Sequence, residues 1–152
     1  MKTDMQRILL AEDDANDIEL TLAALGENNL ANEVVVVNDG VEALDYLHAR
    51  GRFADRPRGN PAVVLLDIKM PKMDGLEVLK RMKADERLRP VPVVMLTSSR
   101  EESDLVESYW LGVNAYVVKP VDFREFISAV KNVGLFWAVV NQPPPGSLRK
   151  IA

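Results

Sequence analysis

Four apolar segments of this sequence each end in side chains that can bind a cation or react with a phosphoryl group. If these segments are parallel strands, their carboxyl ends lie at one edge of a sheet. Three carboxylates, one hydroxyl and one ammonium group would then share a single crevice. The segments and their polar ends are residues 8–11 with Glu12 and Asp13, residues 63–66 with Asp67, residues 93–96 with Thr97, and residues 116–118 with Lys119.

The charges of this set favour a bound magnesium ion. Two carboxylates about 5 Å apart repel by roughly 3 kcal/mol at an effective dielectric near 20. A divalent cation and the ammonium group of Lys119 together balance the carboxylates of Glu12, Asp13 and Asp67. The chain has one histidine, His48, and no cysteine, so an ion here needs oxygen ligands. Such ligands favour magnesium, calcium or manganese over zinc.

Asp67 is the candidate acceptor of a phosphoryl group. Magnesium keeps several waters that phosphate oxygens can replace, so a phosphoryl donor can enter its coordination shell. An ionised Asp67 in line with that group is a competent nucleophile. Thr97 would donate its hydroxyl to a phosphoryl oxygen, while Lys119 and the metal stabilise the charge in transfer.

The segments that position these residues alternate between strand-like and helix-like patterns. Such alternation is typical of βα units, and we expect a doubly wound, flavodoxin-like α/β fold with helices on both faces of a five-stranded parallel sheet. In the common strand order 2-1-3-4-5, strands one and three are neighbours, which brings Glu12 and Asp13 beside Asp67. The predicted strands are residues 7–11, 33–37, 62–66, the segment after Pro92 and residues 115–118; the predicted helices are residues 15–26, the segments after Gly40 and Gly75, residues 101–111 and residues 122–140.

Local signals predict where some of these helices begin and which side they bury. Asp14 is expected to cap the first helix rather than to bind metal. The Asp74-Gly75 pair is expected to form the turn before the third helix. In the second helix, Val41, Leu44 and Leu47 are expected to form the inward stripe.

Length and composition predict one soluble domain. The chain has 152 residues, of which 47% are hydrophobic, and no apolar run approaches the roughly 20 residues of a membrane span. We expect a cytoplasmic protein without a signal peptide, consisting of a domain over residues 1–141 and a Pro-rich tail over residues 142–152. The net charge of −4 argues against nucleic-acid binding.

Four motifs, in order at the ends of strands one, three, four and five, resemble those of a response-regulator receiver domain of two-component signalling, a CheY-like domain. Each motif alone is weakly specific, but the ordered set is specific, and the resemblance spans residues 7 to about 133. The motifs are LLAEDD at residues 9–14, LLDIKMPKMDG at residues 65–75, LTS at residues 96–98 and YVVKP at residues 116–120.

The resemblance implies that Asp67 accepts phosphate from a histidine kinase or a phosphotransfer protein. It implies that Glu12, Asp13, Asp67 and the backbone carbonyl of Lys69 arrange Mg²⁺. In this family the residues two positions after Asp67 and after Thr97, here Lys69 and Ser99, help to set the rate of dephosphorylation. A protein of this kind catalyses its own phosphorylation and dephosphorylation but is not a turnover enzyme.

The resemblance also implies a switch that connects the crevice to a protein-binding surface. Tyr116 would turn inward as Thr97 moves toward the phosphoryl group, and Ser98 would be the small residue that keeps the site open. A cis peptide is implied between Lys119 and Pro120. The switch would alter the face formed by the fourth helix, the fifth strand and the fifth helix.

Two further features resemble the stand-alone regulators that pair with bacterial phytochromes. These features are the long segment 48–61 and the Phe136-Trp137 pair ahead of Pro143–Pro145. Members of that subgroup pair as homodimers through the face of the fourth helix, fifth strand and fifth helix. Trp110, Phe136 and Trp137 are therefore candidates for a buried dimer contact.

The arginines of the long segment and its histidine have simpler interpretations. His48 is expected to be an exposed surface residue rather than a phosphoacceptor. The arginines are expected to form a solvated surface, with kinase docking as the alternative. They are Arg50, Arg52, Arg56 and Arg58.

Three other functions are weighed against the receiver interpretation. A magnesium-dependent phosphohydrolase with an aspartyl-phosphate intermediate usually carries a second Asp two positions after the nucleophile, where this chain has Lys69. A dimerisation module that works without phosphorylation would not need the intact set of polar strand ends. A DNA-binding regulator needs an output domain, and only about 30 residues follow Pro120.

Overall fold

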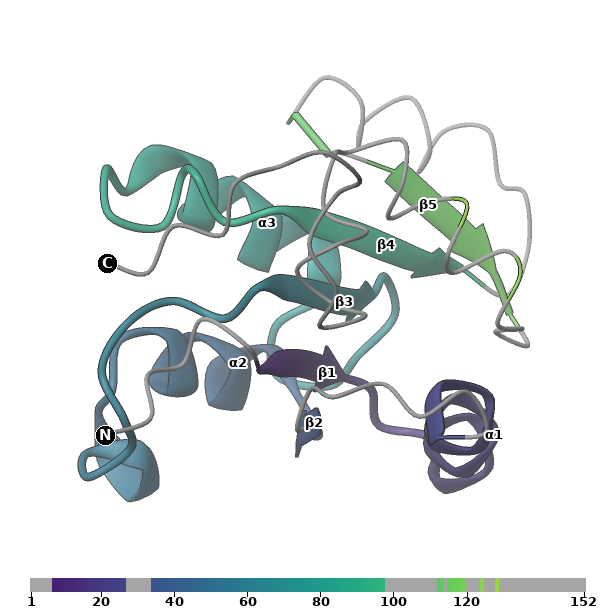
Figure 1. Ribbon diagram of the computed structural model, residues 1–152. Helices are drawn as coiled ribbons and strands as arrows, with labels where there is room; N and C mark the ends of the chain where they lie inside the picture. The colour runs from purple at the N-terminus through teal and green to yellow at the C-terminus, as the bar shows by residue number, and fades with distance from the viewer. Residues whose placement is uncertain are drawn as a thin grey trace, which may run out of the picture.

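The computed structural model describes a five-stranded α/β domain (Figure 1). The residues described are 7–26, 34–97, 112, 113, 115–119, 124 and 128. The helices expected at residues 101–111 and 122–140 and the tail 142–152 lie outside these ranges, so the predicted domain boundary stays a prediction. The elements are β1 (Ile8–Ala11), α1 (Ala15–Gly26), β2 (Val34–Val37), α2 (Gly40–Leu47), the 3-10 helix η2 (Gly51–Phe53), β3 (Val63–Asp67), α3 (Gly75–Ala84), β4 (Val93–Thr97) and β5 (Ala115–Val118).

The strands form one parallel sheet in the order β2-β1-β3-β4-β5, which confirms the predicted topology. In the register, Ala11 pairs with Leu66, Asp67 pairs with Leu96, and Thr97 pairs with Val118. The last residues of β1, β3, β4 and β5 therefore meet at one edge of the sheet, and the strand starts meet at the opposite edge.

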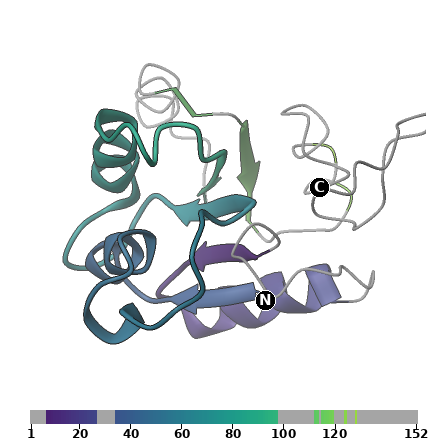
Figure 2. The ribbon, with the colours of Figure 1, turned by 60° about the vertical axis from the view of Figure 1, so that its left-hand side comes forward.

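The two faces of the sheet bury separate hydrophobic clusters. Alternate strand residues, such as Leu66 and Met95, pack with α2 and α3, while Leu65 and Leu96 pack with Leu25 of α1. Figure 2 shows α2 and α3 on one side of the sheet and α1 on the other. Because both faces are covered, the central strands are apolar up to their last residues, as parallel strands usually are. Each fully buried Leu contributes about 1.5–3 kcal/mol relative to an exposed one.

Aspartate side chains fix the start of all three described α-helices. The Asp14 carboxylate accepts a hydrogen bond from the N–H of Asp17 at 2.9 Å. Asp39 and Asp74 cap α2 and α3 in the same way, accepting from residues three positions on. The predicted capping role of Asp14 is confirmed, and Asp74, which was predicted to form a turn with Gly75, is the N-cap of α3.

The predicted inward stripe of α2 was partly wrong. Leu44 and Leu47 are buried, but the side chain of Val41 is 39% exposed. Ala43 and Tyr46 are buried instead. At about 100° per residue, the face shared by Ala43, Leu44, Tyr46 and Leu47 points away from Val41.

No helix among the described residues is both long enough and apolar enough to span a membrane.

Candidate functional site

Glu12, Asp67 and Lys119 meet in a crevice at the carboxyl edge of the sheet. β1 and β3 are neighbours, and the pairing of Ala11 with Leu66 places Glu12 beside Asp67. Both carboxylates are buried, with residue exposures of 0% for Glu12 and 4% for Asp67. Lys119 follows directly after β5, two strands away from β3. The structure thus brings together three of the predicted site residues from three strands.

The ammonium group of Lys119 contacts three carboxylates. Its Nζ atom lies 2.9 Å from Oε1 of Glu12, 3.0 Å from Oδ2 of Asp17 and 3.2 Å from Oδ1 of Asp67. The Lys119 side chain is only 8% exposed, so water screens these pairs weakly. The lysine holds the acidic crevice together by charge.

The ionisation of Asp67 reflects an excess of negative charge. Burial of the carboxylate and the neighbouring charge of Glu12 raise the pKa of Asp67 from 3.8 to about 7, although Lys119 opposes this shift. For Lys119, burial favours the neutral amine, but hydrogen bonds to Glu12 and Asp17 and the charge of Asp67 outweigh burial and raise its pKa. One buried lysine therefore does not fully balance the carboxylates.

The carboxylates fit a divalent cation. Glu12, Asp13 and Asp67 each offer an oxygen, and these oxygens lie within 4.8 Å of one another. Asp13 is exposed, so the cluster faces solvent on one side. All three ligand atoms are carboxylate oxygens, which hard cations such as Mg²⁺ and Mn²⁺ prefer. The raised pKa of Asp67 also indicates that additional positive charge would stabilise the ionised form of this carboxylate.

Backbone contacts hold Glu12 in place. Its N–H donates to the carbonyl of Val37 at 3.0 Å, and its carbonyl accepts from Nδ2 of Asn38 at 3.2 Å. Its Oε2 atom accepts from the N–H of Asp14 at 3.2 Å. β2 and the start of α1 therefore orient this carboxylate toward Lys119.

Gly75 allows the start of α3 to approach Asp67. Its N–H donates to the carbonyl of Ile68 at 2.8 Å. A Cβ atom at this position would overlap the backbone oxygen of Asp67. The Asp74-Gly75 pair thus does more than form the predicted turn, because its glycine sets how closely α3 packs behind Asp67.

The remaining predicted site residues are only partly described. Thr97 ends β4, but its side chain lies outside the described part. Tyr116 in β5 is half-buried and packs against the cluster shared with α2 and α3. Lys69 is exposed two residues beyond Asp67. The predicted roles of these residues stay predictions, as do those of Ser98, Ser99, Trp110, Pro120, Phe136 and Trp137, which lie outside the described residues.

Asp17 is a site residue that the sequence analysis did not single out. It lies in the first turn of α1 and reaches the ammonium group of Lys119. The available signal was its position three residues after the capping Asp14, which places it at the same edge of the sheet. An acid in a first helical turn is common for dipole reasons, so the signal was weak.

The long segment before β3 lies away from this crevice. The Nε2 atom of His48 is 3.8 Å from Oδ2 of Asp85, beyond the end of α3. Arg50 and Arg52 are exposed and paired with acids of α2, as expected for a solvated surface. Arg56 departs from that expectation, because its guanidinium binds backbone carbonyl groups.

A family model described as the response regulator receiver domain matches residues 8–131 of the chain. The chain belongs to this family. The predicted CheY-like fold and the predicted two-component function are thereby confirmed. Phosphorylation of an aspartate is what membership of the receiver family implies.

Relatives of this receiver domain include response regulators, one of which is named for a bacteriophytochrome. Response regulator Rcp1 of Synechocystis sp. is 36% identical over 130 residues, covering 86% of this chain and 87% of the relative. The structure of the bacteriophytochrome response regulator RtBRR is 61% identical, with a TM-score of 0.82, covering 94% of this chain and 86% of that one. The Mn²⁺-bound form of Rcp1 has a TM-score of 0.71 at 36% identity, covering 90% of this chain and 98% of that one.

Proposed function

We propose that this protein is a phosphorylation switch that accepts a phosphoryl group on Asp67 in a Mg²⁺-dependent phosphorelay. The observation that carries the proposal is the contact of one buried lysine with Asp67 and Glu12 at the edge where the strands end. A buried carboxylate with a pKa of about 7 beside a cation-binding cluster is a typical functional arrangement. The receiver family supports the same assignment.

In the proposed transfer, an ionised carboxylate oxygen of Asp67 attacks the phosphorus of a phosphohistidine on the donor protein. The bond between phosphorus and the histidine nitrogen breaks, and that nitrogen keeps the electron pair. Lys119 lies 3.2 Å from Oδ1 of Asp67, where it can stabilise the charge of the transferred group. Mg²⁺ held by Glu12, Asp13, Asp67 and the Lys69 carbonyl would supply further positive charge to the phosphoryl oxygens.

The output of the switch is proposed to pass through β5. Thr97 would contact the phosphoryl group, and Tyr116 would change its packing in response. Tyr116 already contacts the cluster that joins the sheet to α2 and α3. The protein would then signal through contacts with other proteins rather than by repeated turnover. In agreement with this, the chain has Lys69 at the position where phosphohydrolases with an aspartyl-phosphate intermediate usually carry a second Asp.

The proposed donor is a histidine kinase of the bacteriophytochrome type. This proposal rests on the 61% identity to a regulator that is named for a bacteriophytochrome. It is tested by comparing phosphotransfer from a bacteriophytochrome kinase and from an unrelated histidine kinase to this protein. Equal rates from both kinases would contradict the pairing.

A cytoplasmic homodimer completes the proposal. Trp110, Phe136 and Trp137 would lie in the contact between two copies, through the face that includes β5. Light scattering of the full chain, with and without phosphorylation, tests this assembly. A monomer under both conditions at high concentration would contradict it.

The phosphoacceptor assignment is tested with acetyl phosphate and Mg²⁺, followed by intact-mass measurement. The wild type should gain the mass of one phosphoryl group, and Asp67→Asn should gain none. Asp45→Asn removes an acid that lies away from the crevice in α2, and this control should be phosphorylated as the wild type is. An unchanged wild-type mass, together with no response to a beryllofluoride mimic, would contradict the assignment.

A further inference from the structure

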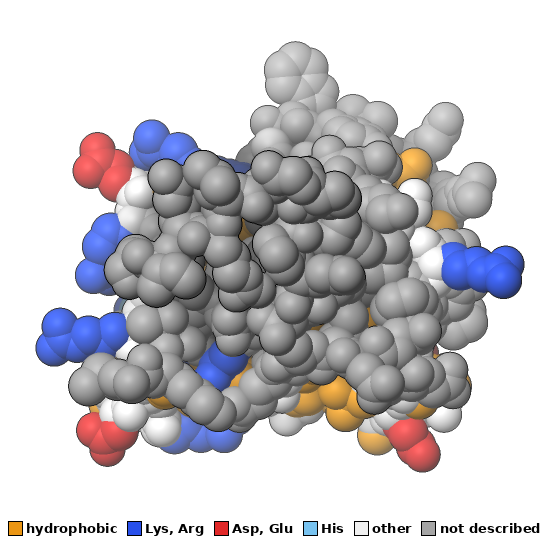
Figure 3. Space-filling model, viewed as in Figure 1, with side chains coloured by type: hydrophobic (Ala, Val, Ile, Leu, Met, Phe, Trp, Pro, Cys, Tyr) orange, Lys and Arg blue, Asp and Glu red, His pale blue; other side chains and the backbone are white. Residues whose placement is uncertain are grey.

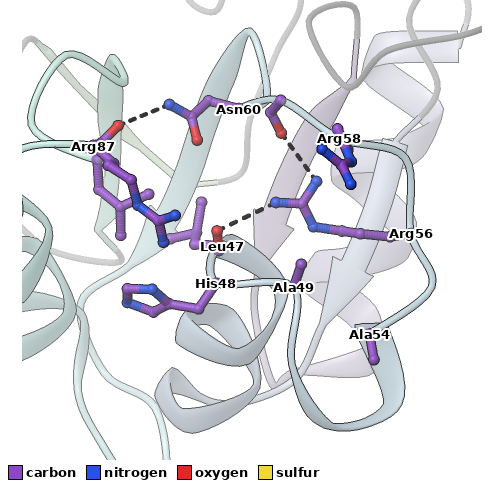
Figure 4. Close-up of a pocket in the computed structure, with 10 residues that line it drawn as sticks. Leu47, His48, Ala49, Ala54, Arg56, Arg58, Asn60 and Arg87 are labelled. Carbon is purple, nitrogen blue, oxygen red and sulfur yellow. Dashed lines mark hydrogen bonds between the residues drawn. The ribbon is translucent and has the colours of Figure 1, made fainter.

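A pocket lies at the edge of the sheet opposite Asp67 (Figure 4). It has a volume of about 470 Å³ and is lined by the end of α2, the segment that leads to β3 and the turn after α3. Pockets that bind small molecules usually have volumes of roughly 300–1,000 Å³. Its charged and polar lining residues are His48, Arg56, Arg58, Asn60 and Arg87.

Arg56 forms a rigid wall of this pocket. Its Nε atom donates to the carbonyl of Tyr46 at 2.5 Å, and Nη2 donates to the carbonyl of Leu47 at 3.2 Å. Its Nη1 atom donates to the carbonyls of Pro57 at 2.6 Å and Gly59 at 3.0 Å. The guanidinium also lies over the Tyr46 ring. Arg56 therefore binds the end of α2 to the following loop.

A second contact holds the two sides of the pocket at a fixed separation. Nδ2 of Asn60 donates to the carbonyl of Arg87 at 2.9 Å, which links the segment before β3 to the turn after α3. Leu88 beside Arg87 is 1% exposed and forms part of the apolar base. The pocket is thus preformed by contacts that involve no ligand.

Arg58 and Arg87 supply the unneutralised charge of the pocket. Figure 4 shows them on opposite sides of the view. Neither side chain has an ion pair with a residue in the described part of the chain, whereas Arg52 of the same segment pairs with Glu42 at 3.2 Å. Among the described residues, Asp85 is an acid that contacts the lining, with Oδ2 at 3.8 Å from Nε2 of His48. Positive charge therefore exceeds negative charge around the pocket.

We propose that this pocket binds a small organic molecule that carries phosphate or carboxylate groups. The guanidinium group is a planar fork that matches both kinds of oxyanion, and charge-assisted hydrogen bonds of this type are the strong ones. Arg58 and Arg87 would bind the oxyanion from two sides, and Leu88 would contact the apolar part of the molecule. β3 lies between this pocket and Asp67, and it spans about 13 Å from Val63 to Asp67 at about 3.3 Å per residue, so both sites can be occupied together.

The test is an NMR titration of the full chain in Mg²⁺-free buffer at constant ionic strength. Pyrophosphate and citrate are the two probes, and they distinguish a phosphate ligand from a carboxylate ligand. We expect saturable amide shifts around Arg58 and Arg87 with at least one probe. Arg58→Ala and Arg87→Ala should each weaken that binding roughly five- to tenfold.

Three controls separate the pocket from non-specific attraction and from the phosphorylation site. Arg52→Ala removes an exposed arginine of the same segment that does not line the pocket, and it should leave binding unchanged. Asp67→Asn should also bind as the wild type does. Circular dichroism checks that each variant is folded. The absence of saturable shifts with both probes, or an equal loss of affinity in Arg52→Ala, would overturn the proposal.

Discussion

The two edges of the sheet carry opposite charge and satisfy that charge in different ways. At the carboxyl edge, the buried carboxylates of Glu12 and Asp67 compete for one lysine. At the amino edge, Arg56 is satisfied by neutral backbone carbonyls. Figure 3 shows more Lys and Arg than Asp and Glu side chains on the left of this view, the side on which the strands of Figure 1 begin.

The charged groups at the acidic edge therefore serve the response to phosphorylation, whereas Arg56 at the basic edge stabilises the fold. At the acidic edge, Lys119 does not fully balance the carboxylates. Binding of a cation, a proton or a phosphoryl group therefore changes the free energy of this site. Arg56 binds backbone carbonyls at the edge opposite Asp67, so its removal should affect folding rather than phosphorylation. Substitutions at each edge can test this separation, beginning with the largest expected effect.

The largest effect is expected from the ionisation of Asp67 in the Mg²⁺-free protein. Its pKa is about 7 in the folded chain against 3.8 for the ordinary group, so the folded state binds more protons between these values. Stability should therefore fall as pH rises from about 4 to about 7, by at most about 4 kcal/mol. Urea unfolding of the wild type and Asp67→Asn across this range measures the effect.

The difference between these two proteins isolates the contribution of Asp67. Asp67→Asn should gain stability relative to the wild type as pH rises, and Asp45→Asn should not. Saturating Mg²⁺ should reduce the difference, because the cation stabilises the ionised carboxylate. Parallel pH profiles for the wild type and Asp67→Asn would show that the acidic edge carries no excess charge.

Lys119→Met should slow phosphorylation by acetyl phosphate about 100-fold, which corresponds to about 2.7 kcal/mol in the barrier. The substitution removes the ammonium group that lies 3.2 Å from Asp67. The rate is followed by intact mass at saturating Mg²⁺. Lys80→Met changes an exposed lysine of α3 and serves as the control. A rate in Lys119→Met within threefold of the control would contradict the role of this lysine.

Arg56→Ala should destabilise the fold by about 2 kcal/mol, because several carbonyl groups lose their donor. Its rate of phosphorylation should stay within twofold of the wild type, since the carbonyls of Tyr46 and Pro57 lie at the other edge. Arg52→Ala removes an exposed ion pair with Glu42 and a cation–π contact with Phe53, and it should cost no more than about 1 kcal/mol. Equal losses in the two variants, measured by urea unfolding, would contradict the structural role of Arg56.

The sequence predicted the acidic edge better than the basic edge, for a physical reason. The strand order and the placement of Glu12, Asp13 and Asp67 follow from apolar runs that each end in a polar residue, which is a local signal. The four arginines before β3 look alike in sequence. Only the folded loop shows that Arg56 reaches back to Tyr46 and Leu47. The pairing of Asp17 with Lys119 joins residues far apart in the chain and likewise has no local signature.

The smallest effect is expected from Asp17, whose carboxylate lies 3.0 Å from Nζ of Lys119. Because the Asp17 side chain is 27% exposed, its pair with Lys119 should contribute less than the fully buried contacts. Asp17→Asn keeps the backbone N–H that Asp14 caps, yet leaves the lysine less firmly positioned. Phosphorylation by acetyl phosphate at saturating Mg²⁺ should slow about two- to fivefold, with unchanged stability to within about 0.5 kcal/mol.

Glu19→Gln changes an exposed acid two residues further along α1 and should react as the wild type does. An equal rate for Asp17→Asn and Glu19→Gln would show that Lys119 needs only Glu12 and Asp67, and that the acidic edge does not extend to α1.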